Sequence, residues 1–173
     1  MTDKEINCIL KDMVIICDSR EKKNQHILEY FDCNNIPYIS RKLDTADYSF
    51  FLPNYPNIGL DECILVEKKN SLDEIVGNFT KDRERFKREF ERVENEHVHL
   101  VIENASWKKV LSGTYRSSFP PKSLMASILT FSIRYDFHTW FCTPQETGEL
   151  IYNILYYELR EQLLIMQSGK NNY

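Results

Sequence analysis

Three carboxylates spaced along the first half of the chain have the residue types for one shared chemical task. They are Asp18 in Val-Ile-Ile-Cys-Asp-Ser-Arg-Glu, Asp47 in Ala-Asp-Tyr, and Glu67 in Leu-Val-Glu-Lys-Lys. Carboxylate oxygens are the ligands that a hard divalent cation prefers. A cation activates water for attack, and a lysine beside it stabilises charge that gathers on a phosphoryl oxygen. The pattern predicts metal-dependent phosphodiester hydrolysis, although a solvated strand end would carry similar residues.

The extended run from Ile64 to Lys69 predicts where two of these groups point. Successive side chains of a strand point to opposite faces, so residues two apart share a face. Glu67 and Lys69 are therefore expected on one side of the strand and Lys68 on the other. Asp47 lies upstream, just ahead of another strand-like run, so the pattern is an aspartate, a spacer and Glu-x-Lys.

Apolar runs and segments with helical periodicity alternate along the chain and predict the elements that carry these side chains. The expected strands span residues 13–17, 36–42, 48–52, 62–69, 97–103 and 138–142. The expected helices span residues 22–33, 71–77, 81–95, 107–111, 122–134 and 144–166. This alternation predicts an α/β fold with a mixed central sheet flanked by helices. We expect a single domain over residues 1–173, with its core at about 13–166 and a frayed tail at 168–173.

Length and charge limit the classes of protein that fit. A chain of 173 residues suffices for one compact domain, and 42% hydrophobic with 28% charged residues excludes wholesale disorder. The formal net charge of −4 disfavours a protein that coats nucleic acid non-specifically, so any DNA contact must be a local patch. Metal-binding carboxylates would themselves lower the net charge, so a nuclease remains compatible with it.

The five cysteines are interpreted as reduced thiols of a cytoplasmic protein, because their number is odd and no Cys-x-x-Cys occurs. Zinc is not expected, since nothing near His97 and His99 completes a ligand set. Those histidines are interpreted as satisfied core or surface residues. We see no signal peptide, and no apolar run reaches the roughly 18 residues that a membrane helix needs. No membrane partner is therefore expected.

Four ordered motifs resemble those of the nuclease domain of the XPF family, the structure-specific DNA endonucleases that include archaeal Hef. The family's Asp-x-Arg-Glu after an apolar strand appears at residues 18–21, and its Gly-Asp-Tyr appears as Ala-Asp-Tyr at 46–48. Its Glu-Arg-Lys with a following aspartate appears as Glu-Lys-Lys-Asn-Ser-Leu-Asp at 67–73, and its helical Arg-Phe pair appears at 85–86. The resemblance covers roughly residues 14–160 and implies the restriction-endonuclease-like, PD-(D/E)xK fold.

This resemblance implies an endodeoxyribonuclease that uses Mg²⁺ or Mn²⁺ to hydrolyse phosphodiester bonds at branched, flap or fork DNA. Asp47 and Glu67 would hold the cation, with the backbone carbonyl of Lys68 as a further ligand. Asp18 and Glu21 would join the acidic site as ligands of the metal or of water.

Lys69 and Asp73 complete the expected site. Lys69 would position the attacking water or help to deprotonate it, and would stabilise the phosphate. Asp73 would either orient Lys69 or cap the short helix that begins after Ser71.

Basic residues near the motifs are candidates for contact with DNA phosphates. The candidates are Arg20, Lys68, Arg83, Arg85 and Arg88. The expected helix at 81–95 also fits a solvated face, because Arg85 and Glu89 form an ordinary i, i+4 pair. Both interpretations of that helix stay open at this point.

Three departures from the family pattern stand out. Ala46 replaces a glycine and is expected to need only an ordinary backbone angle or slightly more room. Lys68 replaces an arginine and would keep the charge of a phosphate contact but lose its fork. Many family members carry a following tandem helix-hairpin-helix domain, which we do not expect in this chain.

Two other functions are compatible with the motifs. One is a catalytically silent, DNA-binding partner subunit of a nuclease complex, which need not keep every acidic residue, whereas this chain keeps the set. The other is a non-enzymatic DNA-binding or inhibitor domain, which the net charge of −4 does not favour. We therefore expect an active nuclease of the DNA repair type, nucleoid-associated if the host is a prokaryote or a phage.

A homodimer is expected from the aromatic residues of the carboxy-terminal half. They outnumber what one core of this size should bury, and Tyr152 and Tyr156 widen the apolar face of the closing helix. Aromatic-rich patches are typical of interfaces, although a thick core of helix packed on sheet would look similar.

Overall fold

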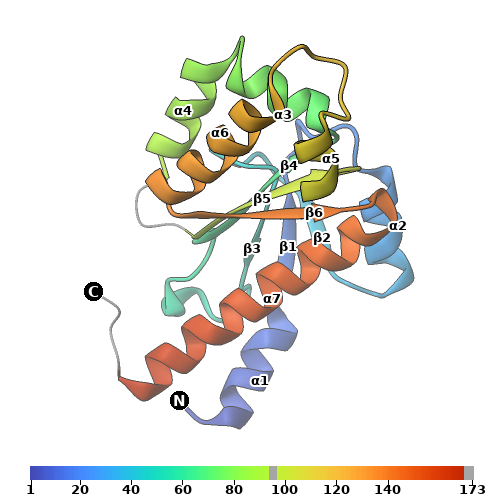
Figure 1. The fold of residues 1–173 in the computed structure, drawn as a ribbon. Helices are drawn as coiled ribbons and strands as arrows, with labels where there is room; N and C mark the ends of the chain where they lie inside the picture. The colour runs from blue at the N-terminus through green and yellow to red at the C-terminus, as the bar shows by residue number, and fades with distance from the viewer. Residues whose placement is uncertain (94–96, 170–173) are drawn as a thin grey trace.

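A computed structural model describes residues 1–93 and 97–169, and within them six strands form one mixed sheet in the order β2-β1-β3-β4-β5-β6 (Figure 1). The strands are β1 (Val14–Cys17), β2 (Tyr38–Ser40), β3 (Tyr48–Phe51), β4 (Ile64–Lys69), β5 (His97–Glu103) and β6 (Phe137–Cys142). β1 runs parallel to β2 and antiparallel to β3, and β3 is antiparallel to β4. β4, β5 and β6 are mutually parallel, so the α/β fold with a mixed sheet is confirmed.

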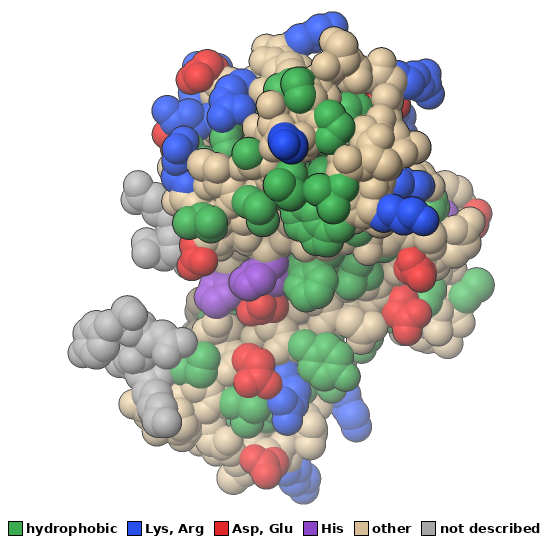
Figure 2. Space-filling model, viewed as in Figure 1, with side chains coloured by type: hydrophobic (Ala, Val, Ile, Leu, Met, Phe, Trp, Pro, Cys, Tyr) green, Lys and Arg blue, Asp and Glu red, His purple; other side chains and the backbone are tan. Residues whose placement is uncertain are grey.

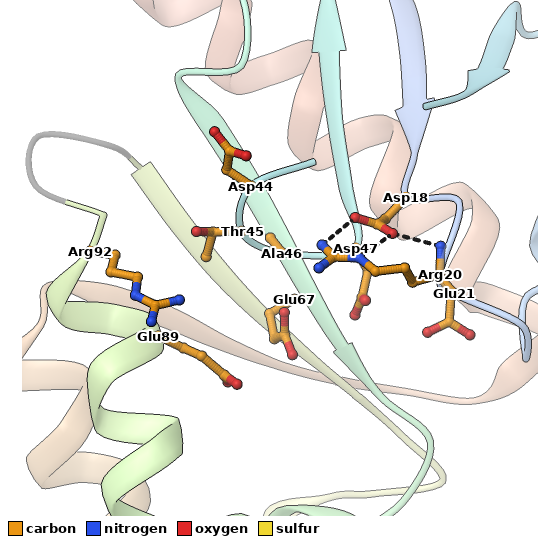
Figure 3. Close-up of a pocket in the computed structure, with 10 residues that line it drawn as sticks. All are labelled: Asp18, Arg20, Glu21, Asp44, Thr45, Ala46, Asp47, Glu67, Glu89 and Arg92. Carbon is orange, nitrogen blue, oxygen red and sulfur yellow. Dashed lines mark hydrogen bonds and ion pairs between the residues drawn. The ribbon is translucent and has the colours of Figure 1, made fainter. Parts of the chain in front are cut away.

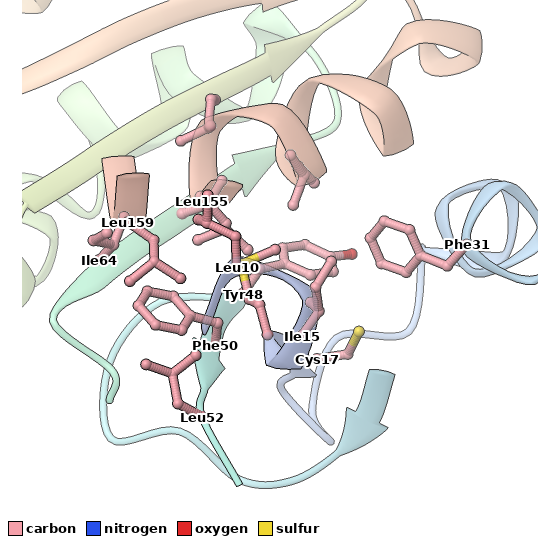
Figure 4. Close-up of a cluster of buried hydrophobic side chains, with 14 of the residues drawn as sticks. Leu10, Ile15, Cys17, Phe31, Tyr48, Phe50, Leu52, Ile64, Leu155 and Leu159 are labelled. Carbon is pink, nitrogen blue, oxygen red and sulfur yellow. The ribbon is translucent and has the colours of Figure 1, made fainter. Parts of the chain in front are cut away.

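Helices cover both faces of the sheet (Figure 1). They are α1 (Asp3–Asp12), α2 (Gln25–Cys33), α3 (Leu72–Phe79), α4 (Arg83–Glu91), α5 (Trp107–Ser112), α6 (Pro121–Arg134) and α7 (Pro144–Ser168), with a short 3-10 turn at Pro56–Ile58. The first core lies between the sheet and α1, α2 and α7, and contains Tyr48, Phe50 and Leu155 (Figure 4). The second lies between the sheet and α3 to α6, and contains Phe86 and Phe131.

Most expected elements are present, and several boundaries move. The strand expected at 36–42 is only β2, and the helix expected at 22–33 begins at Gln25. α3 continues past Gly77 to Phe79, and α4 ends at Glu91 rather than at residue 95. Residues 94–96 lie outside the described part of the chain, as do residues 170–173 of the tail expected to fray.

The first helix, α1, was absent from the expected elements, and the core expected from residue 13 begins earlier. Thr2 and Glu5 form a capping box that starts α1, a signal that was readable as Thr-x-x-Glu. Ile6, Ile9 and Leu10 of this helix are buried in the first core. α1 lies beside the long closing helix α7 (Figure 1).

His97 and His99 both lie against a carboxylate of α7. His97 Nδ1 and His99 Nε2 each lie 3.2 Å from a carboxylate oxygen of Glu158 on α7. Trp140 donates to His99 Nδ1 at 3.0 Å. These contacts hold β5 and β6 against α7. Within the described ranges, no helix is long and apolar enough to cross a membrane.

Candidate active site

The carboxyl end of β4 has the side-chain arrangement expected from strand alternation. Glu67 and Lys69 lie on the side of the sheet that α3 and α4 cover, and the Lys69 Nζ donates to Glu67 Oε1 at 2.5 Å. The same ammonium lies 5.5 Å from the centre of the Phe86 ring on α4. Burial alone would lower the pKa of Lys69, but the Glu67 carboxylate outweighs it and the pKa is raised. Lys69 is therefore a stable cation at the site.

Asp47 is brought to this edge by the turn that enters β3. Its backbone N–H donates to the carbonyl of Val66 at 3.1 Å, and its Oδ2 accepts from the Lys68 N–H at 2.8 Å. These bonds fix the aspartate beside β4. Burial, followed by the charge of Glu67, raises the pKa of Asp47 well above its ordinary range. The two carboxylates repel each other in a partly dry setting, which a cation would relieve.

Ala46, the residue before Asp47, does not have the ordinary backbone angle expected for it. Ala46 has a φ of +68°, in the left-handed region that glycine tolerates and alanine does not favour. The alanine therefore needs more than an ordinary backbone angle. The turn holds Ala46 in this conformation because its neighbour Asp47 is fixed by two backbone hydrogen bonds. The Asp47 N–H donates to the Val66 carbonyl, and the Asp47 carbonyl accepts from the Asp18 N–H.

Asp47 and Glu67 line one open cavity of about 260 Å³ at this edge of the sheet (Figure 3). The other residues around it are Asp18, Arg20, Glu21, Asp44, Thr45, Ala46, Glu89 and Arg92. Figure 3 shows Glu67 between the Asp47 side and the α4 side, from which Glu89 and Arg92 project. Six carboxylates and two arginines thus meet in one space, which is suited to a cation.

Asp18 lies in the cavity wall, and protein donors surround its carboxylate. Its carboxylate accepts four hydrogen bonds, three from the backbone N–H, Nε and Nη2 of Arg20 and one from the Leu43 N–H. Burial would raise the pKa of Asp18, but these donors outweigh it and lower the pKa. Since its oxygens are occupied, Asp18 holds Arg20 in place. The Arg20 side chain stays about half exposed at the cavity edge, where a phosphate could reach it.

Lys68 also differs from the expected DNA contact. Its side chain is 0% exposed and points to the face of the sheet opposite Glu67, as alternation requires. The Nζ donates to the Lys23 carbonyl at 3.1 Å and to Asn70 Oδ1 at 2.8 Å, and lies 3.9 Å from Glu21 Oε1. An ammonium enclosed in this way has no path to a phosphate. Lys68 instead ties β4 to the loop that carries Glu21.

Several supporting residues lie away from the cavity. Asp73 accepts from the Arg116 backbone N–H at 2.7 Å, and Ser71 rather than Asp73 caps α3. The Arg83 guanidinium lies 5.0 Å from the Phe131 ring centre and donates to the Phe79 carbonyl. Neither Asp73 nor Arg83 lines the cavity.

The remaining arginines of α4 lie on its outer side. Arg85 Nε lies 3.4 Å from Glu89 Oε1, so the i, i+4 pair expected for a solvated face is present. Arg88 is exposed and is also absent from the cavity wall. Both remain candidates for backbone contact with DNA.

Two cavity residues, Glu89 on α4 and Arg92 directly after it, were not named as members of the acidic site. Burial, followed by the charge of Glu67, raises the pKa of Glu89, which places this carboxylate within the field of the site. A sequence signal existed, because Glu89 directly precedes the buried Phe90 and lies three residues after the buried Phe86. Residues that flank a buried helical stripe lie at the boundary between sheet and solvent.

The donor set suits a hard cation. The cavity wall offers carboxylate and hydroxyl oxygens and contains no cysteine or histidine. Among residues 1–93 and 97–169, no three acidic, histidine or cysteine side chains converge closely enough to enclose an ion by themselves. Magnesium commonly keeps several waters and is bound by only one or two carboxylates. Asp47 and Glu67 fit that mode of binding, because burial and the charge of Glu67 raise the pKa of Asp47 and a cation would offset both.

Comparison with known proteins identifies similar domains. A family model described as "ERCC4 domain" matches residues 17–154. XPF from Aeropyrum pernix has a TM-score of 0.62 and 18% identity, with 84% of this chain and 61% of that chain covered. XPF from Aeropyrum pernix in complex with DNA has a TM-score of 0.63 and 18% identity, with 90% and 73% covered. The chain thus spans 61% of the length of the first structure. Among curated proteins, no match was found.

The mixed sheet, its flanking helices and the matched structures define the α/β nuclease fold of XPF. The chain belongs to the ERCC4 domain family, since the family model covers most of its residues. The resemblance drawn from the four motifs is thereby confirmed.

Proposed function

We propose that this domain is a divalent-metal-dependent endonuclease that cleaves branched, flap or fork DNA of the kind that arises during repair. The observation that carries the proposal is that Asp47 and Glu67 line one cavity within an ERCC4 domain, with Lys69 paired to Glu67 next to it. Asp47 and Glu67 would hold Mg²⁺ or Mn²⁺. A cation bound there would activate the attacking water and neutralise charge on the scissile phosphate.

The chain's own residues would position the DNA and stabilise the charge that develops. Lys69 is kept protonated by Glu67 and presents a fixed ammonium beside the carboxylates, suited to the phosphate oxygens that gain charge. Arg20 supplies a second cation at the rim, with its guanidinium clamped by Asp18 and by the Leu43 carbonyl. Arg92 would approach the same phosphates from the α4 side.

A cleavage assay on matched DNA substrates tests this proposal. Flap, fork and plain duplex DNA of equal length would be incubated with Mg²⁺, with Mn²⁺ or with EDTA. We expect cutting of flap or fork DNA with either metal, weaker cutting of duplex, and no cutting in EDTA. Equal cutting in EDTA would refute metal dependence, and equal cutting of all three substrates would refute the preference for branched DNA.

A catalytically silent partner subunit is the alternative, and the cavity disfavours it. A domain freed from catalysis need not keep an acidic residue at each of the cavity positions. Here Asp47 and Glu67 both line the cavity and Lys69 is paired to Glu67. If the wild type binds DNA but cleaves none of the three substrates, the silent role would be favoured.

We also propose that the domain forms a homodimer, through a face that includes Trp140 of the expected aromatic residues but not Tyr152 or Tyr156. Tyr152 and Tyr156 pack against the first core and so do not supply an exposed patch. Large apolar side chains are exposed instead on α5, α6 and β6, and Figure 2 shows hydrophobic atoms gathered over these elements. The residues are Trp107, Leu111, Leu129, Ile133 and Trp140. A second copy of this chain would cover that surface, as contiguous apolar patches are typical of interfaces.

Light scattering at micromolar concentration tests the dimer. Ile133 is 83% exposed on α6, so Ile133→Asp should leave the fold intact and shift the mass from twice 20.6 kDa to 20.6 kDa. The control is Met166→Asp at the far end of α7, which is also exposed and should leave the dimer intact. A wild-type mass of 20.6 kDa would rule the dimer out.

A further inference from the structure

Glu89 is the carboxylate on α4 that faces the cavity, and its position is fixed by the packing of that helix. The rings of Phe86 and Phe90 lie on either side of it in the sequence and are both buried in the second core. The Phe86 ring meets those of Phe79 and Phe131 with centroid separations of 5.5 and 6.0 Å. Because these contacts anchor the helix, the Glu89 side chain is held beside the sheet edge and lines the cavity with Glu67.

Arg85, the cation closest to Glu89 on α4, leaves the Glu89 carboxylate with oxygens free to accept further hydrogen bonds. Arg85 Nε lies 3.4 Å from one oxygen, which is longer than a well-formed hydrogen bond. The Arg85 side chain is 64% exposed, so it is free to leave that pair for solvent or for a phosphate. Figure 3 shows the Glu89 carboxylate directed into the space in front of Glu67. A negative group therefore faces Asp47 and Glu67 from the opposite wall.

We propose that Glu89 contributes to cation binding in this cavity, by accepting hydrogen bonds from the hydration shell of an ion held by Asp47 and Glu67. This inference rests on the proposed function of the site. Magnesium retains several waters in proteins, and those waters need acceptors on the side away from the direct ligands. Glu89 is the carboxylate that α4 offers on that side. Cation binding would then also secure α4, with its outer arginines, against the sheet.

A second ion pair on the same helix provides a matched control. Lys87 Nζ lies 3.4 Å from Glu91 Oε1, with the same i, i+4 spacing and distance as Arg85 and Glu89. Glu91→Gln removes one charge and one ion pair from α4, as Glu89→Gln does, but Glu91 does not line the cavity. Any general effect of charge or of helix stability should appear equally in both variants.

The test is Mn²⁺ binding to the DNA-free protein by isothermal titration calorimetry, for the wild type, Glu67→Gln, Glu89→Gln and Glu91→Gln. Circular dichroism and urea unfolding would confirm that each variant is folded. Loss of an outer acceptor typically weakens metal affinity by 10- to 100-fold. We expect a loss of about 10-fold for Glu89→Gln, less than twofold for Glu91→Gln, and the greatest loss for Glu67→Gln.

The outcomes separate this inference from the proposed function. If Glu67→Gln abolishes Mn²⁺ binding while Glu89→Gln and Glu91→Gln both bind like the wild type, the role of Glu89 is overturned and the cation site stands. If the wild type binds no Mn²⁺, or Glu67→Gln binds as tightly as the wild type, the cation site fails and the role of Glu89 fails with it. If Glu89→Gln and Glu91→Gln weaken Mn²⁺ affinity equally, the effect comes from the general charge of α4, and the inference is overturned.

Discussion

Replacing Lys68 by methionine separates its buried role from a role in DNA contact. Methionine keeps most of the apolar stem and removes the ammonium, which donates to the Lys23 carbonyl at 3.1 Å and to Asn70 Oδ1 at 2.8 Å. The side chain is 0% exposed, so water does not readily replace those donors. The variant should therefore lose folding stability while the DNA-facing side of β4 is unchanged.

The magnitude follows from the two acceptors. Each buried acceptor that loses its partner costs about 1–3 kcal/mol, and the removal of a buried charge returns part of that cost. We expect a net loss of about 2 kcal/mol in the free energy of unfolding. For a domain of this size, that loss corresponds to a fall of about 4–8 °C in Tm. Lys87→Met is the control, because Lys87 is a partly exposed lysine on α4 and should change stability by less than about 0.5 kcal/mol.

Urea unfolding and DNA binding would be measured on the same preparations. Fluorescence anisotropy in EDTA, across a range of salt concentrations, gives the number of phosphate contacts from the slope of log affinity against log salt. We expect Lys68→Met to keep the wild-type slope. If Lys68→Met is as stable as the wild type and its slope is smaller by about 0.9, the lysine contacts a phosphate and its assignment as a buried tie is wrong.

Three further outcomes are expected. Ala46→Gly should raise the free energy of unfolding by about 1 kcal/mol in urea titrations, because glycine relieves the φ of +68°, and an unchanged or lower stability would show that the turn carries no strain. Lys69→Ala should lower single-turnover cleavage with DNA affinity nearly unchanged, and equal losses of both would argue against a role in the chemical step. Hydrogen bonds from His97 and then His99 lower the pKa of Glu158, and the bond to Glu158 raises the pKa of His97. The contribution of Glu158 to stability is fully present above its unfolded pKa of about 4.3, and it is lost as the pH falls through its lowered pKa in the folded protein. The contribution of His97 is fully present below its unfolded pKa of about 6.5, and it is lost as the pH rises through its raised pKa in the folded protein. Urea titrations should thus find the stability gap between the wild type and Glu158→Gln largest at about pH 4.3–6.5, and a gap independent of pH would refute the pairing.

The sequence predicted those features that depend on local periodicity. Alternation along β4 was sufficient to place Glu67 and Lys69 on one face and Lys68 on the other, and the structure agrees. The apolar runs likewise predicted the six strands, although β2 is shorter than expected. The missed α1 is polar apart from its buried stripe, so only its capping box marked its start.

Features that depend on contacts between distant residues could not be predicted in this way. The Asp18 carboxylate accepts hydrogen bonds from the Leu43 N–H, 25 residues away, and from its neighbour Arg20, and no pattern near β1 indicates the first of these. The enclosure of Lys68 depends on the loop at Lys23, which no pattern near β4 encodes. Glu89 enters the cavity because α4 folds back over β4, and an isolated helix would present it only as half of an ion pair.

Asp47 and Glu67 are proposed to form the cation site of a DNA nuclease, and single-turnover cleavage tests this role most directly. Wild type, Asp47→Asn and Glu67→Gln would be compared on flap or fork DNA in saturating Mg²⁺, after circular dichroism has confirmed that each is folded. Loss of one charged ligand from a water-activating site should slow cleavage by about 10³-fold or more in either variant, with DNA binding in EDTA retained. Wild-type cleavage rates in both variants would contradict the assignment of the site.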